Sequence, residues 1–169
     1  MILGIEGDKE FPGLEVKNLG MINVISGRNF AGKSAFLKKL SRTENKWNRI
    51  FLRSGNKFYF DRMRNSFWVK ATIDNHTRLA LIDDFEAGIH HRNFKEIWDC
   101  VFKLAADGIQ FFITSHSKEC IEYFNKVAIE NPEIASVYFR MEKHGSKTRA
   151  EVYTIEELND ALETGWEFR

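Results

Sequence analysis

The sequence of 169 residues has few of the features that assign a chain to a special structural class. Its two cysteines, Cys100 and Cys120, are too few for a disulfide scaffold, and its two prolines leave no proline-rich linker. No apolar run approaches the roughly 20 residues that a membrane-spanning helix needs. The N-terminal residues MILGIEGDKEF carry acids early and lack the basic-then-apolar pattern of a secretory signal. We therefore expect reduced thiols, no membrane association and a cytoplasmic location.

An excess of one charge is also absent, because the net charge is only +1. The overall charge therefore gives no argument for nucleic-acid binding. The distribution is uneven, however. Residues 38–70 hold ten lysines and arginines against two acids, a local charge of +8, together with seven aromatic residues. A solvated face over aromatic core residues would explain this pattern. So would a partner surface for the phosphate backbone and stacked bases of DNA, or for an acidic protein. These interpretations stay open.

The composition is that of a globular protein, with 43% hydrophobic and 29% charged residues. The length suits one domain, and we expect residues 1–169 to form it. The near-continuous apolar runs RLALID (78–83) and IQFFITS (109–115) predict strands that are buried on both faces. Between them, residues 91–108 have the i, i+3, i+4 apolar spacing of a helix. Strands that alternate with helices predict an α/β fold with a central, mostly parallel sheet flanked by helices.

Further elements are expected towards both ends of the chain. They are two antiparallel strands at 14–20 and 21–26 joined at Gly20, a helix at 32–43, a hairpin at 49–60, a helix at 117–128 and a hairpin at 136–155. A last helix follows, for which Thr154 and Glu157 have the spacing of a capping box. The expected fold thus has antiparallel strands at both chain ends.

A glycine-rich loop follows the apolar start of INVISGRNFAGKS (22–34), in the spacing G-x-x-x-x-G-K-S. Phosphates need several converging backbone N–H groups, and the start of a helix adds partial positive charge. Glycine lets the backbone wrap an anion, a lysine can reach the β- and γ-phosphates, and a serine hydroxyl can bind Mg²⁺. We therefore predict a phosphate-binding loop, with its serine as a metal ligand. Its residues are Gly27, Arg28, Asn29, Phe30, Ala31, Gly32, Lys33 and Ser34.

Polar residues directly after two predicted strands complete the pattern. Asp83 and Asp84 follow LALI (79–82), and His116 follows FFITS (111–115). A nucleotide-binding loop needs an acid at the end of a neighbouring buried strand for the Mg²⁺ shell, which is the role we predict for Asp83. Asp84 would then face the attacking water as general base, and His116 would sense the γ-phosphate. The predicted catalytic residues are Lys33, Asp84 and His116.

The segments INVISGRNFAGKS, LALIDDFEAGIHH and QFFITSHSKECIEYF resemble the Walker A, Walker B with D-loop and switch-histidine segments of ABC-type ATPases. The resemblance is to RecF and SMC heads and above all to OLD-like ATP-binding proteins, and the stretch from residue 137 to the C-terminus adds to it. It implies a P-loop NTPase fold with ATP and Mg²⁺ as ligands. It also implies hydrolysis in a head-to-tail dimer, with a second copy or another ATPase head as the partner.

The sequence also departs from the pattern of that family. Glutamate usually stands at the position of Asp84, and aspartate is one methylene shorter, which sets its carboxylate back by more than about 1 Å. The only glutamine, Gln110, is on the wrong strand for the family's glutamine-bearing loop. Residues 62–79, where the signature helix should begin, contain no glycine. The parts that bind nucleotide are therefore complete, whereas those that make turnover efficient are missing or altered.

Two functions from different classes follow. The first is a weak, dimerisation-dependent ATPase that acts on DNA or on a partner protein. The second is a module that binds ATP without hydrolysing it and docks on another ATPase or effector. Asp84 and His116 favour the first function, and the missing glutamine and signature favour the second. GTP stays an alternative to ATP, although the sequence has no N-K-x-D motif for guanine.

Overall fold

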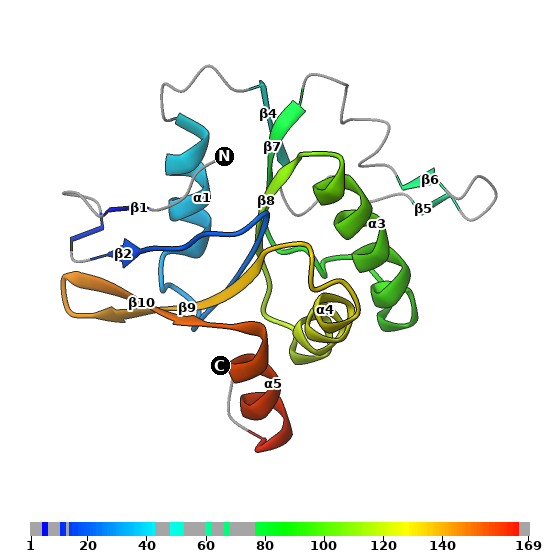
Figure 1. Cartoon of the computed structure of the whole chain (residues 1–169). Helices are drawn as coiled ribbons and strands as arrows, with labels where there is room; N and C mark the ends of the chain where they lie inside the picture. The colour runs from blue at the N-terminus through cyan, green and yellow to red at the C-terminus, as the bar shows by residue number, and fades with distance from the viewer. Residues whose placement is uncertain are drawn as a thin grey trace.

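The computed structural model describes residues 5–6, 11–12, 14–42, 48–52, 60–61, 66–67 and 77–165 (Figure 1). A six-stranded sheet lies at its centre. In spatial order the strands are β10 (Lys147–Tyr153), β9 (Ser136–His144), β3 (Ile22–Ser26), β8 (Gln110–Thr114), β7 (Thr77–Ile82) and β4 (Asn48–Leu52). The strands from β9 to β4 are parallel, and β10 is antiparallel to β9. The predicted α/β fold with a mostly parallel sheet is confirmed.

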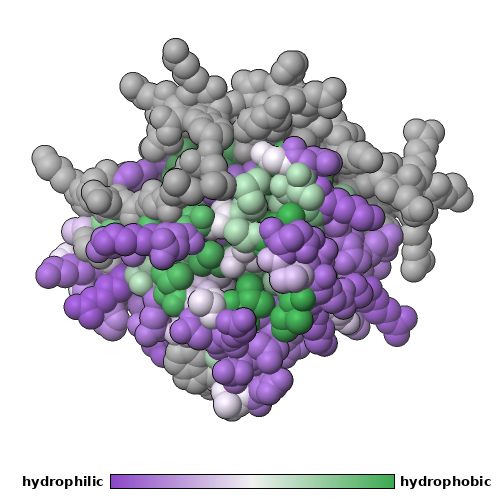
Figure 2. Space-filling model, viewed as in Figure 1, coloured by the Kyte–Doolittle hydropathy of each residue, from purple (hydrophilic) through white to green (hydrophobic). Residues whose placement is uncertain are grey.

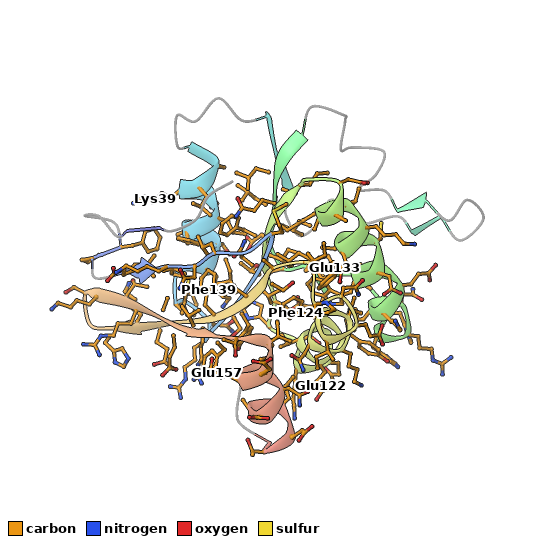
Figure 3. All side chains as sticks on the ribbon, viewed as in Figure 1. Lys39, Glu122, Phe124, Glu133, Phe139 and Glu157 are labelled. Carbon is orange, nitrogen blue, oxygen red and sulfur yellow. The ribbon has the colours of Figure 1, made fainter. Side chains whose placement is uncertain are left out.

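Different helices cover the two faces of the sheet (Figure 1). The helices are α1 (Lys33–Arg42), α3 (Phe94–Ala106), α4 (Lys118–Glu130) and α5 (Ile155–Glu163). All residues of β8 are buried, and alternate side chains enter two cores: Phe111 packs with α3, α4 and α5, whereas Phe112 packs with α1. Figure 3 labels one aromatic residue of each core, Phe124 of α4 and Phe139 of β9. Helices cover both faces of the sheet, so the side chains on both sides of a central strand are buried. This explains the continuous apolar runs from which the strands were predicted.

The N-terminal strands differ from the expectation. β2 (Glu15–Val16) pairs antiparallel with β1 (Ile5–Glu6), so an antiparallel pair does lie at this end of the chain. The expected pairing of 14–20 with 21–26 is wrong, because both edges of β3 are occupied by the parallel strands β8 and β9. All five residues of β3 are buried, which suits a central strand better than one arm of a hairpin. Gly20 instead bonds through its backbone N–H and carbonyl oxygen to the side chain of Asn23.

The C-terminal elements match the prediction. β9 and β10 form the expected hairpin, with Gly145 at a φ of 62° in its turn. Thr154 and Glu157 form the capping box of α5: the Thr154 hydroxyl accepts from the Glu157 N–H at 3.2 Å, and the Glu157 carboxylate accepts from the Thr154 N–H at 2.8 Å. The helix expected at 91–108 consists of a 3₁₀ turn (His91–Asn93) followed by α3. Its buried residues have the spacing from which it was predicted.

Most of the basic stretch 38–70 lies outside the described residues, including the turn of the hairpin expected at 49–60. β4 pairs parallel with β7, and two short strands, β5 (Phe60–Asp61) and β6 (Ser66–Phe67), pair with each other. Lys39, labelled in Figure 3, places its Nζ 5.4 Å from the centroid of the Phe11 ring.

The remaining observations concern the surface, the helices and the thiols. Hydrophilic side chains predominate on the face shown in Figure 2. None of the helices in the described ranges is long and apolar enough to cross a bilayer. Cys100 is partly exposed and Cys120 is buried, and neither forms a disulfide.

Candidate functional site

The loop between β3 and α1 is shaped by two glycines. Gly27 has a φ of 136° and Gly32 a φ of 97°, values that side chains disfavour. A Cβ atom on Gly27 would overlap the backbone oxygen of Met141, because β9 packs directly against the loop. Glycine is therefore required at this position both for its backbone conformation and for the close approach of β9. The result is an open backbone turn at the start of a helix, the geometry that binds phosphate in other proteins.

Phe30 is the exceptional residue of this loop. Its φ is 67°, in the left-handed region that aromatic residues seldom adopt, and its side chain is 96% exposed. Such a conformation costs on the order of 1–2 kcal/mol for a residue with a Cβ. Neither property was evident from the sequence, since the motif leaves this position unspecified. An exposed aromatic side chain thus stands at the tip of the loop.

Lys33 is the first residue of α1 and is only 5% exposed. Its Nζ donates to the carbonyl oxygens of Gly27 at 2.7 Å and Arg28 at 3.1 Å, so the side chain folds back across the loop. Burial lowers the pKa of Lys33, and nearby carboxylates, Asp84 first among them, partly oppose that shift. The first N–H groups of α1 have no partner within the helix. A cation and backbone donors are thus gathered where an anion would lie.

Ser34 and Asp83, the two residues predicted to hold Mg²⁺, lie in direct contact. The Ser34 hydroxyl donates to Asp83 Oδ1 at 3.0 Å, and the Thr114 hydroxyl donates to the same oxygen at 2.7 Å. Asp83 is 3% exposed, and it follows β7 at the edge where β3 and β8 also end. A hydroxyl beside a carboxylate is the oxygen set that suits Mg²⁺, which takes one or two protein ligands and completes its shell with phosphate and water. These residues therefore fit the implied metal. In the described part of the chain no three His, Cys, Asp or Glu side chains group as a metal site, so a cage made of these side chains is not present there.

Asp84 and His116 are in direct contact. His116 Nε2 lies 3.1 Å from Asp84 Oδ1, and the Asp84 N–H donates to the Thr114 hydroxyl at 2.8 Å. Asp84 has a φ of 52°, a left-handed conformation that aspartate tolerates better than most residues. The His116 N–H donates to Glu86 Oε1 at 2.6 Å, while Glu86 Oε2 is buried with no hydrogen-bond partner among the described residues. A carboxylate and an imidazole are thus held together beside Lys33 and Ser34.

Lys33, Ser34, Asp84 and His116 line one cavity. It has a volume of about 480 Å³ and is open to solvent. Its lining residues are Asn29, Phe30, Gly32, Lys33, Ser34, Ala35, Asp84, His116 and Lys143. A second cavity of about 500 Å³ shares Asn29, Phe30 and Lys143 with the first, and it extends along the β9–β10 hairpin. Residues of the loop, Asp84 and His116, which come from three separate segments of the sequence, therefore lie around one cavity.

Three residues of the site were missed by reasoning from the sequence. Thr114 was foreseeable in part, because it ends the strand that precedes His116. Glu86 was visible as a further acid after Asp84, but nothing in its spacing indicated a bond to the His116 backbone. No sequence pattern indicated that Lys143 lies at the cavity, because this placement depends on how far β9 extends past the end of β3.

Comparison with known proteins identifies the fold. The sequence matches no protein-family model and no curated protein. Among solved structures, MJ1267, an ATP-binding cassette of an ABC transporter, aligns with a TM-score of 0.58 at 11% identity over 95% of this chain and 92% of that one. Its ADP conformation aligns with a TM-score of 0.56 at 12% identity, covering 91% of this chain and 89% of that one.

An Smc head domain from Pyrococcus yayanosii matches less closely. Its TM-score is 0.37 at 16% identity, and the alignment covers 53% of this chain and 15% of that one. The two alignments with MJ1267 show that the chain has the fold of an ABC-type ATPase, and at such low identity they show the fold alone. The narrower resemblance to the OLD-like and RecF group stays a prediction.

Proposed function

We propose that this chain binds Mg·ATP at the loop 27–34 and hydrolyses it slowly. One observation carries the proposal: the Ser34 hydroxyl bonds to Asp83 Oδ1 at 3.0 Å directly beside a cavity that Lys33, Asp84 and His116 line. The same cavity thus offers donors for phosphate, oxygen ligands for a metal and a carboxylate that can accept a proton. The fold shared with ATP-binding cassettes supports ATP as the nucleotide.

Each residue would have a defined task during hydrolysis. Lys33 and the N–H groups at the start of α1 would bind the phosphates, and Ser34 and Asp83 would hold Mg²⁺. The bound metal would withdraw charge from the phosphate oxygens. Asp84 would accept the proton of the attacking water, and its contact with His116 at 3.1 Å would orient the carboxylate for that step. Thr114 would position both acids, because it bonds to Asp83 Oδ1 and to the Asp84 N–H.

The proposed hydrolysis is slow for two reasons. Aspartate at position 84 has a shorter reach than glutamate, and a misplacement of about 1 Å can cost about 100-fold in rate. The sequence also lacks the family's glutamine loop and glycine-containing signature, so a dimer with a second copy or another ATPase head would assemble an incomplete site. In this proposal residues 1–169 act as one nucleotide-binding domain.

In this proposal the ATPase acts on DNA or on an acidic protein partner, which it contacts through residues 38–70. The support is the local charge of +8 among seven aromatic residues in that stretch. The alternative function is a module that binds nucleotide without hydrolysis and docks on another ATPase or effector. The missing glutamine and signature favour that alternative, and the Asp84–His116 contact favours hydrolysis.

Steady-state turnover of wild type and Asp84→Asn separates the two functions. Loss of a general base reduces turnover by about 100-fold or more. We therefore expect slow phosphate release by wild type, a loss of that size in Asp84→Asn, and similar Mg·ATP affinity for both proteins in a calorimetric titration. Asp107→Asn, at the exposed end of α3, is the matched control and should behave as wild type. A wild type that binds Mg·ATP but releases no phosphate above the Asp84→Asn level would establish the non-hydrolysing module.

A further inference from the structure

The end of β9 extends beyond β3 and runs beside the loop. In the parallel pairing of these strands, Ser26, the last residue of β3, lies opposite Arg140. β9 continues for four more residues to His144, and the backbone oxygen of Met141 lies where a side chain on Gly27 would point. The tip of the β9–β10 hairpin therefore flanks the nucleotide site within the same chain.

The alternation of a strand separates the residues of this extension into two sets. Glu142 pairs with Arg140 at 3.0 Å and with His144 at 3.2 Å, so these three side chains form a cluster. Met141 is buried towards the core that contains α1, and Lys143, two residues on, is on the same side of the strand as Met141. Lys143 is exposed, makes no ion pair among the described residues, and lines both cavities at the loop.

The charges around the cavity that Lys33 and Asp84 line would be balanced better by a second cation. Asp84 lines the cavity, and Asp83 and Glu86 lie close enough to oppose the lowering of the Lys33 pKa. Lys33 itself is engaged with two carbonyl oxygens of the loop. A nucleoside triphosphate would add several negative charges beside these carboxylates, which favours a further cation near the phosphates. A flexible ammonium group is a strong hydrogen-bond donor to phosphate.

We propose that Lys143 is a second phosphate-binding cation, supplied by the β9–β10 hairpin of the same chain to the terminal phosphates of a bound nucleoside triphosphate. The inference rests on the proposed nucleotide binding. The terminal phosphates are the appropriate ones because Lys143 shares its cavity with Asp84 and His116, the residues proposed to act there. Since the cation belongs to the same chain, this contact needs no residue of a partner subunit.

The test is a calorimetric titration of Mg·ATP and Mg·ADP into wild type and four variants. The loss of one charge-assisted contact at an exposed site corresponds to about a tenfold change in the dissociation constant. We expect Lys143→Ala and Lys143→Gln to weaken ATP binding about tenfold and to weaken ADP binding by less than about threefold. Lys143→Arg should restore ATP affinity to within about twofold of wild type. Lys147→Ala, an exposed lysine of the same hairpin that does not line the cavity, should bind as wild type.

The outcomes distinguish this inference from the function on which it rests. Wild-type ATP affinity in Lys143→Ala, together with clear binding by wild type, would overturn the role of Lys143 and leave nucleotide binding intact. Equal losses for ATP and ADP would also overturn it, because the contact would then not be to the terminal phosphates. A wild type that binds neither nucleotide would overturn both the inference and the proposed function.

Discussion

At the scale of single residues, the contact between His116 Nε2 and Asp84 Oδ1 has a direct consequence for turnover. His116 follows β8 and touches the proposed base, so its removal should disturb the proton transfer and leave phosphate binding by the loop in place. We expect His116→Ala to slow hydrolysis by about 100-fold while the Mg·ATP dissociation constant changes by less than about threefold. Steady-state phosphate release and calorimetric titration measure the two quantities.

His91→Ala is the control for this experiment, because His91 is exposed in the 3₁₀ turn before α3. It should keep wild-type turnover. If His116→Ala loses turnover and ATP affinity to the same degree, the histidine has a structural role, and its contact with Asp84 does not serve the chemical step.

Individual site residues were predictable to different degrees. Ser34 and Asp83 could be paired because a helix-starting serine and an acid at a strand end follow from local sequence patterns. The contact between Asp84 and His116 could not, since it depends on the left-handed φ of 52° at Asp84 and on the hydroxyl of Thr114 between two strands. Phe30 was expected only as one of the loop residues, and its exposure depends on a backbone conformation that the motif does not specify.

At the scale of elements, the packing of β9 against the loop predicts a large effect at Gly27. A side chain there would need a φ of 136° and would overlap the backbone oxygen of Met141. We expect Gly27→Ala to lower the free energy of unfolding by about 3 kcal/mol, from backbone strain and overpacking together. Denaturant unfolding followed by circular dichroism measures the loss.

Gly145→Ala is the matched control for Gly27→Ala. Gly145 also has a positive φ, 62°, but a Cβ atom there would meet nothing within 4 Å. The expected cost is therefore about 1 kcal/mol, from the backbone alone. Equal destabilisation by the two substitutions would contradict the close packing of β9 on the loop.

The elements that sequence reasoning identified correctly are those with a strong local signal. Buried strands such as β8, the helix α3 and the capping box of α5 each have a periodic or spaced pattern within a few residues. The pairing of β2 was predicted wrongly because strand partners are chosen by tertiary contacts: β3 is buried along its whole length and is bordered by β8 and β9. The length of β9 fits the hairpin that was predicted, but its position beside the loop was not predicted, for the same reason.

At the scale of the whole molecule, the parallel sheet explains why distant segments form one site. β3, β8 and β7 are neighbours and parallel, so their carboxyl ends meet at one edge. The loop, His116 and Asp83 with Asp84 follow those three ends. In open α/β sheets ligands bind at this edge, so the three segments lie where a ligand site is expected.

The uneven charge of the molecule leads to a prediction for DNA binding. If residues 38–70 contact the phosphate backbone, affinity should fall steeply with rising salt through the release of counterions. We expect the double variant Arg62→Glu and Arg64→Glu to bind duplex DNA at least about tenfold more weakly than wild type at low salt, with unchanged ATP affinity. Fluorescence anisotropy with labelled DNA measures this. If the double variant binds as wild type does, or if neither protein binds, the stretch serves a protein partner or none.

The central claim is that the loop between β3 and α1 binds the phosphates of Mg·ATP, and calorimetric titration of wild type and Lys33→Ala tests it most directly. Lys33 is buried in the loop and lies beside the cavity that Ser34 and Asp84 line. We expect clear, Mg²⁺-dependent binding by wild type and by the exposed control Lys103→Ala, and none detectable by Lys33→Ala with its circular dichroism spectrum unchanged. Unchanged ATP affinity in Lys33→Ala would contradict the claim.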